Sequence, residues 1–239
     1  MTKAQGKMLK GQAIIYDASE PQRWIDAIGP DVTKVIKEFG AQAFSGADSM
    51  ADSTTTLAEA GSAETTVALK AGATGGALLI TTDNADNDGA NIQLQGEAFK
   101  LASGKPAYFG CKFQISEPTE SDFFVGLAIT DSDILGGVTD AVGFKKVDGS
   151  ASILFDMTKD SATTDTVVGT AAGATDMILE FYFDGTNLDS YVDGVLQTRQ
   201  AQTNLPDDEY LTPTVQFLTG SDLAITMTID WLRCFQVNA

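Results

Sequence analysis

Residues 181–195 read FYFDGTNLDSYVDGV, and this stretch decides the fold class. It contains two Asp-Gly pairs, at 184–185 and 193–194, and each pair follows an apolar run rich in aromatic residues. Asp-Gly suits two-residue hairpin turns, whose backbone needs positive φ angles. The stretch therefore predicts a three-stranded antiparallel meander with the strands ILEFYF, NLDSYV and VLQTR.

A period of two continues through most of the chain after residue 76. Apolar residues fill every second position in AYFGCKFQI (107–115) and DFFVGLAIT (122–130), as is typical of strands with one face on a core. Near the C-terminus the alternating apolar residues are Leu223, Ile225, Met227, Ile229 and Trp231. Further strands are expected at residues 76–82, 91–99, 141–147, 152–157, 177–183, 188–192 and 195–199. Because no helix separates about ten strands in roughly 160 residues, we expect a two-layer antiparallel β-sandwich or jelly roll.

The region before this sandwich has a different pattern, so we divide the chain into an N-terminal arm (1–75) and a sandwich domain (76–239). Apolar residues between positions 19 and 40 recur at spacings of three and four, and Gly29-Pro30 interrupts them. This pattern predicts two short helices. The sequence leaves open whether the arm packs on its own sandwich or on a neighbouring subunit.

Residues 41–75 are rich in Ala, Ser, Thr and Gly. Such a composition buries little apolar area, which favours an extended linker. A strand is expected there only at residues 65–70.

Charge argues against anionic partners. The chain of 239 residues has 15 basic and 33 acidic residues and a formal net charge of -18, so direct binding of nucleic acid is not expected. Residues 1–40 are different, because they hold six basic and five acidic residues, and Lys3, Lys7 and Lys10 precede the first acid, Asp17. This basic start is either a solvated segment or an arm that docks on an acidic surface. No stretch is apolar over about 18 residues and no signal peptide is recognised, so neither a membrane span nor secretion is expected.

Candidate reactive groups are few. The chain has no histidine, which removes His-based nucleophilic and zinc sites. Cys111 and Cys234 lie in strand-like runs and are expected to be buried free thiols. Glu180 and Asp184 have a carboxylate spacing that one strand could present to a glycoside, but Asp184 is expected to serve its turn.

The best metal candidate is DNADNDG (83–89), which resembles the start of a calcium loop. Gln95 stands where such a loop needs a bidentate Glu, so no metal or other cofactor is predicted, although calcium stays an alternative.

Two likenesses extend these inferences. The meander with its Tyr-Phe-Asp-Gly and Tyr-Val-Asp-Gly-Val segments, together with TMTIDWLRCFQV, resembles concanavalin A-like lectin/glucanase sandwiches, including laminin G-type modules. Glucanases of this fold use a Glu-x-Asp-x-x-Glu run, which is absent from this chain. The segments GGALLITTDNADNDGANIQLQGEAF, GKPAYFGCKFQI and SDFFVGLAITD resemble virion structural proteins of tailed bacteriophages.

The second likeness implies a capsid decoration or cement protein that is made in the host cytoplasm and carried on the virion surface. It would not be an enzyme, would bind and stabilise the major capsid protein lattice, and would form a homo-oligomer such as a dimer or trimer. A glycan-binding virion or tail-fibre module is the alternative. The residues expected to contact the capsid or the sandwich are Lys3, Lys7, Lys10, Trp24, Ile28, Val32, Val35 and Phe39.

Overall fold

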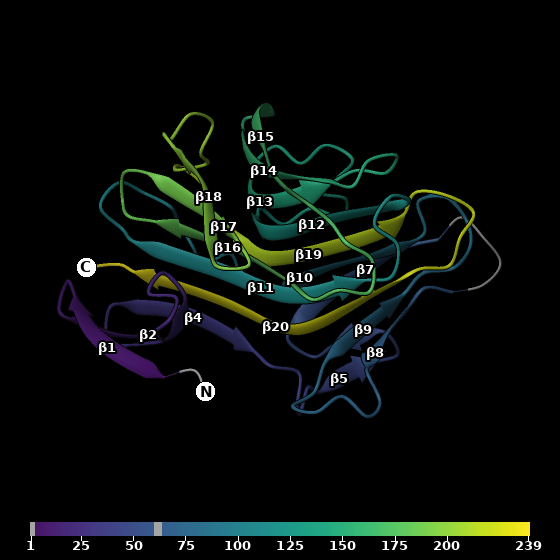
Figure 1. Cartoon of the computed structure of the whole chain (residues 1–239), viewed down its shortest axis with the longest axis horizontal. Coiled ribbons are helices and arrows are strands. Elements are labelled where there is room, and N and C mark those ends of the chain that lie inside the picture. Colours follow the sequence, from purple (N-terminus) through teal and green to yellow (C-terminus); the bar gives the residue numbers. More distant parts are fainter. Residues whose placement is uncertain (1–2, 60–63) are drawn as a thin grey trace.

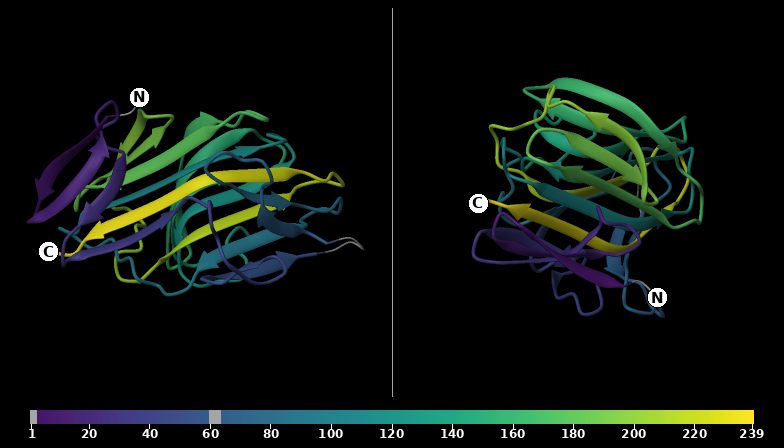
Figure 2. Two further views of the ribbon diagram at one scale, coloured as in Figure 1. Left: turned by 90° about the horizontal axis from the view of Figure 1, so that it is seen from below. Right: turned by 60° about the vertical axis from the view of Figure 1, so that its left-hand side comes forward.

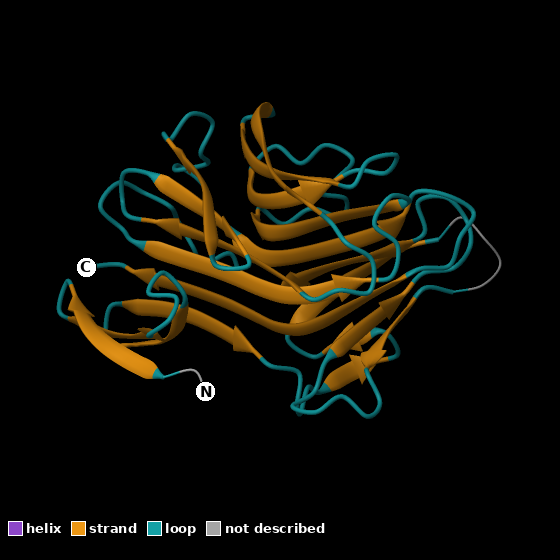
Figure 3. Ribbon diagram, viewed as in Figure 1, coloured by secondary structure: helices purple, strands orange, loops and turns teal. Residues whose placement is uncertain are grey.

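The structure is a computed structural model that describes residues 3–59 and 64–239. These residues form 20 strands and no helix (Figure 3). Most strands belong to two antiparallel sheets that stack face to face (Figure 1). The predicted two-layer β-sandwich is confirmed. No segment of the described chain is a helix of the length and apolarity needed to span a membrane.

The strand order defines the two layers. The seven-stranded sheet has the order β15 (Ala162–Thr170), β14 (Ser152–Lys159), β13 (Ala141–Lys146), β12 (Ser121–Ala128), β19 (Thr212–Thr219), β10 (Gly89–Leu94) and β7 (Ser53–Ala58). The eight-stranded sheet has the order β18 (Val195–Gln200), β17 (Leu188–Val192), β16 (Met177–Phe183), β11 (Ala107–Ile115), β20 (Thr226–Val237), β9 (Leu78–Thr81) and β8 (Thr66–Leu69), with β4 (Val32–Lys37) also paired to β20. A separate three-stranded sheet contains β1 (Ala4–Leu9), β2 (Gln12–Asp17) and β3 (Trp24–Ile28), and a small hairpin contains β5 (Phe44–Gly46) and β6 (Ser49–Met50).

The meander predicted from the Asp-Gly pairs is β16–β17–β18. Val192 pairs with Val195, so Asp193 and Gly194 form a two-residue turn, and both have positive φ angles, of 50° and 81°. The first connection is longer than predicted, because it contains the four residues 184–187. There the Asp184 carboxylate accepts hydrogen bonds from two backbone N–H groups of its own loop, as expected for a turn residue.

Between the two sheets lies the main apolar core. The inward residues of β11 are Phe109, Cys111, Phe113 and Ile115, and all are buried. Phe113 meets Phe123 of the other sheet edge-on, with ring centroids 5.2 Å apart. Cys111 and Cys234 are buried free cysteines, as predicted. Alternation along β11 and β12 thus identified the packed faces correctly.

The alternation predicted for residues 223–231 fails at both ends of this run. The pairing of β11 with β20 shifts register between Lys112 and Phe113, so that Ile229 and Trp231 do not share a face. Because a β-bulge reverses the side-chain parity of the strand beyond it, Trp231 lies on the outer face and Leu232 points to the core. Leu223, at the other end of the run, precedes the strand and is 45% exposed.

The prediction of two helices in residues 19–40 is wrong, because this segment forms β3 and β4. Val, Thr and Ile dominate β4, and these β-branched residues favour strands. The long strand β20 also offers an edge for pairing. This edge pairs with β9 along one half of the strand and with β4 along the other half. Tertiary pairing therefore overrides the helical spacing.

Residues 41–75, predicted as a linker, contain β5 to β8 outside the undescribed positions 60–63. Strand β8 lies at the one position where a strand was expected, and it pairs with β9. Strand β7 pairs with β10 and forms an edge of the seven-stranded sheet. The first 75 residues thus contribute strands to both layers.

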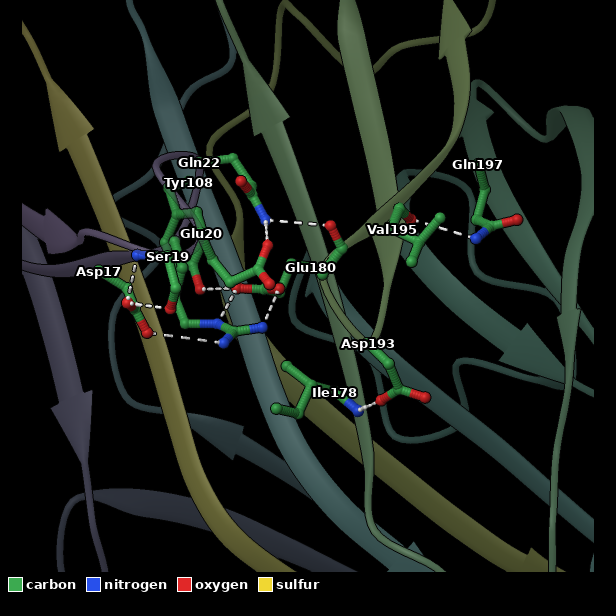
Figure 4. A network of polar contacts seen from close by, with 12 residues as sticks. Asp17, Ser19, Glu20, Gln22, Tyr108, Ile178, Glu180, Asp193, Val195 and Gln197 are labelled. Atoms are coloured by element: carbon green, nitrogen blue, oxygen red, sulfur yellow. Dashed lines mark hydrogen bonds and ion pairs between the residues drawn. The ribbon is translucent and has the colours of Figure 1, made fainter. Parts of the chain in front are cut away.

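Strands β1–β3, which we call the N-terminal meander, cover one end of the outer face of the eight-stranded sheet, beside the C-terminus (Figure 2). Trp24 is fully buried there and lies nearly parallel to Tyr108, with ring centroids 6.2 Å apart. Arg23 makes two hydrogen bonds of 2.7 Å to the buried carboxylate of Glu180. The Tyr108 hydroxyl donates to the same carboxylate, also at 2.7 Å (Figure 4). The arm therefore packs on its own sandwich.

We expect Arg23→Ala to lower the free energy of unfolding by about 3 to 5 kcal/mol, because it leaves the Glu180 carboxylate buried without its cation. Lys34→Ala is the matched control, since Lys34 pairs with Asp26 at 2.7 Å but both side chains are substantially exposed. It should change stability by less than about 1 kcal/mol. Urea denaturation followed by circular dichroism measures both values. Equal losses of unfolding free energy in the two variants would contradict the stabilising role of the Arg23–Glu180 ion pair.

Candidate functional site

The polar cluster around Glu180 is closed to ligands. Glu180 and Tyr108 are buried, and the N-terminal meander covers them. Burial raises the pKa of the Tyr108 hydroxyl, and the neighbouring Glu180 carboxylate raises it further. Arg23 and Tyr108 already occupy the oxygens of Glu180. This cluster holds the meander in place and leaves Glu180 no room for a substrate.

The predicted contact residues have different surroundings. Lys3 and Lys7 are exposed, and the Lys7 ammonium lies 5.3 Å from the centre of the Tyr16 ring. The Lys10 ammonium donates to the backbone carbonyl of Ala239. Of the apolar residues, Ile28 is 55% exposed. The others pack within this chain, and they are Trp24, Val32, Val35 and Phe39.

An open hollow lies on the outer face of the seven-stranded sheet, mainly over β13, β14 and β15. We call it the β13–β15 cleft, and its volume is about 310 Å³. Its lining is Phe124, Ile134, Leu135, Gly137, Val138, Lys145, Val147, Leu154, Asp156, Thr158, Thr163 and Asp165. Polar side chains thus converge beside apolar ones in this hollow, a combination that also occurs in small-molecule sites.

Two carboxyl groups meet in this cleft because of strand register. Asp156 of β14 lies directly opposite Asp165 of β15, and cross-strand partners have Cβ atoms about 5 Å apart. Lys145, from β13, reaches both, with its ammonium 2.6 Å from the Asp156 carboxylate and 3.0 Å from that of Asp165. The Thr158 hydroxyl donates to the second oxygen of Asp156 at 3.1 Å.

Burial and contact change the protonation of these groups. Desolvation raises the pKa of Asp156 to about 7, and the hydrogen bond with Asp165 adds to this, while Lys145 opposes it. Burial alone would lower the pKa of Lys145, but its hydrogen bonds to the two carboxylates outweigh burial and raise it. Asp156 can therefore hold or release a proton near neutral pH. Asp156 is 3% exposed, so Asp165 and Lys145 are the charged groups that a ligand would reach first.

The connection between β12 and β13, residues 129–140, borders this cleft. We call it the 129–140 loop. Gln93 donates to the carbonyl of Ile129 and accepts from the N–H of Asp131, each at 2.9 Å. Gln216 accepts from the N–H of Leu135 at 2.8 Å. The loop also buries apolar side chains against the sheet, and this cluster contains Phe124, Ala128, Ile134, Val138 and Ala141. The loop consequently covers the middle of the outer face.

The sequence did not reveal this site. Asp156 and Asp165 are separated by a turn, and only the pairing of β14 with β15 brings them together. The DNADNDG segment lies between β9 and β10, and its last residue, Gly89, begins β10. Within residues 3–59 and 64–239, no three carboxylate or thiol groups are arranged to hold a metal ion.

Comparison with known proteins identifies the fold. No family model matches the sequence, and no curated protein matches it either. An endo-1,3-beta-glucanase from Streptomyces sioyaensis is similar in structure, with a TM-score of 0.61, 12% identity and coverage of 90% of this chain and 99% of that one. The carbohydrate recognition domain of Emp47p has a TM-score of 0.57 and 11% identity, and the match covers 81% of this chain and 92% of that one.

An endo-beta-1,4-glucuronan lyase from the fungus Trichoderma reesei is also similar, with a TM-score of 0.54, 8% identity and coverage of 84% of this chain and 94% of that one. At such identities the likeness shows the fold alone. This chain has the concanavalin A-like sandwich, as the sequence predicted.

The prediction that the chain is not an enzyme is corrected by these comparisons. Most of the similar structures are glycoside hydrolases, and one is a lyase, so this fold commonly supports chemistry on glycans. The prediction relied on the missing run of acids along one strand, on the absence of histidine and on the likeness to virion structural proteins. Neighbouring strands bring acids together equally well, as Asp156 and Asp165 do.

The raised pKa of Asp156 predicts how the free energy of unfolding depends on pH. Its folded-state pKa, about 7, lies above its ordinary value of 3.8, so protonation favours the folded state. Its contribution is fully present below pH 3.8 and is lost as the pH rises through 7. The free energy of unfolding of the wild type, measured relative to Asp156→Asn, should therefore fall across this range. Denaturation at several pH values tests this, with Asp222→Asn, an exposed position, as the control. A difference that is flat or rises with pH would contradict it.

Proposed function

We propose that the chain is a carbohydrate-binding module that holds a neutral glycan in the β13–β15 cleft. The observation that carries this proposal is the cleft's lining, where Asp165 and Lys145 stand beside an apolar wall that includes Leu135 and Val147. A sugar ring has apolar C–H faces and hydroxyl edges. Carboxylate oxygens accept hydrogen bonds from hydroxyls and an ammonium donates to them, so the lining complements both parts of a sugar.

The charge of the chain favours a neutral ligand. A net charge of -18 repels polyanions at long range. The cleft itself has two carboxyls and one ammonium, so it offers no excess of positive charge to a uronic acid or a sulfated glycan. Among the ligands named for the similar structures, a neutral beta-glucan therefore fits better than a glucuronan.

The fold agrees with this proposal but carries little weight alone, because one fold hosts many functions. The carbohydrate recognition domain of Emp47p and several glucanases have the same sandwich. The lining of the cleft supports the proposal, and these similar structures make carbohydrate the first ligand class to test.

We also propose, from the sequence resemblance, that the module is carried on a bacteriophage virion as a decoration protein. It would be made in the host cytoplasm, bind the major capsid protein and form a homo-oligomer. The supporting observation is the outer face of the N-terminal meander, where Met8 is 68% and Ile28 is 55% exposed. Lys3 and Lys7 add positive charge to this region of an otherwise acidic chain. An acidic partner surface with apolar contacts would complement it.

Binding in the β13–β15 cleft predicts that Asp165→Asn weakens binding of a beta-1,3-glucan oligosaccharide about tenfold, because a charged acceptor is lost. The matched control is Asp176→Asn, at the residue that precedes β16 of the opposite sheet. Asp176 pairs with Lys112 at 3.1 Å, much as Asp165 pairs with Lys145 at 3.0 Å. Isothermal titration calorimetry measures the affinities, and a reducing-end assay on the same glucan detects any turnover. Equal affinities of both variants and the wild type would place the glycan elsewhere, and no binding by the wild type would refute the function.

For the virion role, we expect the double change Lys3→Glu and Lys7→Glu to weaken co-sedimentation with undecorated capsids at least tenfold, since it reverses the charge facing an acidic partner. Both side chains are exposed, so the circular dichroism spectrum should not change. Wild-type association should also weaken as salt is added. Association that is indifferent to both the double change and salt would contradict docking through the meander.

A further inference from the structure

A second hollow lies on the other side of the 129–140 loop, on the same outer face of the seven-stranded sheet. We call it the Asn91 cleft, and its volume is about 220 Å³. Its polar lining consists of Thr56, Asn87, Asn91, Ser132, Asp133 and Gln216. Ala58 and Leu218 add an apolar part to this lining, so both clefts combine polar and apolar side chains.

The side-chain oxygen of Asn91, Oδ1, has no hydrogen-bond donor among the described residues. The residue is 3% exposed, and its Nδ2 donates to the carbonyl of Asp131 at 2.8 Å. This bond fixes the orientation of the amide, so Oδ1 is the atom that remains free to accept. Oδ1 is buried and receives no hydrogen bond from any residue that the structure describes. A buried acceptor in this state is unfavourable, so the polar floor of this cleft is incompletely hydrogen-bonded.

Strand order places the two clefts along one line across the sheet. Asn91 of β10 lies between Thr56 of β7 and Gln216 of β19, which are its direct cross-strand partners. From β10, the order runs through β19 and β12 to β13 and β14, below the first cleft. With strands about 4.8 Å apart, the two clefts are roughly 15 to 20 Å apart.

The 129–140 loop lies between the clefts and lines both of them. Ser132 and Asp133 line the Asn91 cleft, while Ile134 and Leu135 line the β13–β15 cleft. A ligand that fills both clefts must therefore cross over this loop. A linear oligosaccharide has the required length and the hydroxyl donors, whereas a single sugar can fill one cleft only.

We propose that the Asn91 cleft is a second subsite for the glycan, so that the module binds an oligosaccharide that spans the 129–140 loop. This inference rests on the proposed function of the β13–β15 cleft. One sugar lies in the β13–β15 cleft against Asp165 and Lys145. Hydroxyls of a more distant sugar contact the exposed polar residues of the Asn91 cleft, Ser132 and Asp133. Affinity therefore depends on chain length.

The test compares a ladder of beta-1,3-glucan oligosaccharides by isothermal titration calorimetry. The variant is Ser132→Trp, which fills the Asn91 cleft from an exposed loop position. Ser45→Trp makes the same change at an exposed position of β5, outside the lining of both clefts. We expect the affinity of the wild type and of Ser45→Trp to rise about tenfold between short and long oligosaccharides, and Ser132→Trp to lose this rise while it binds short ones normally.

The outcomes separate this inference from the function on which it rests. Wild-type affinity that does not grow with oligosaccharide length would overturn the second subsite and leave the β13–β15 cleft standing. A rise with length that Ser132→Trp does not reduce would also overturn it. Failure of the wild type to bind any member of the ladder would overturn the proposed function together with the subsite.

Discussion

Packing between the inner faces of the two sheets is the interaction on which the rest of the structure depends. Aromatic side chains such as Phe113 and Phe123 meet across the layers, and most of the large buried residues belong to this core. Burial of apolar side chains is the main favourable term in folding, so this contact fixes which face of every strand points inward. The remaining side chains are thereby placed on two outer faces, where the N-terminal meander and the 129–140 loop pack.

The sequence was informative where a local rule decides the structure. Alternation found the core face of β11, and Asp193-Gly194 found a hairpin turn. Prediction from the sequence failed where pairing with a distant segment of the chain decides the structure. Strand β4 has helix-like spacing but pairs with β20, and the bulge in β20 moves Trp231 to the outer face. The candidate site was missed for the same reason, since register across strands, which no local pattern shows, creates the contact of Asp156 with Asp165.

The two outer faces have different roles in this account. On the eight-stranded sheet, the N-terminal meander closes over Glu180 and leaves that carboxylate saturated. On the seven-stranded sheet, the 129–140 loop covers the middle and leaves a cleft on each side. Within the β13–β15 cleft, the charged groups that a ligand would reach first are Asp165 and Lys145. Glycan recognition at this surface is our proposal, and the same fold occurs in glucanases and in a carbohydrate recognition domain.

The most direct test of the central claim is a crystal structure of this chain with a beta-1,3-glucan oligosaccharide bound. The account predicts that the sugar lies on the outer face of the seven-stranded sheet, with hydroxyls within hydrogen-bonding distance of Asp165 and the Lys145 ammonium. An oligosaccharide seated instead on the eight-stranded sheet, for example beside Lys112 and Asp176, would contradict the account.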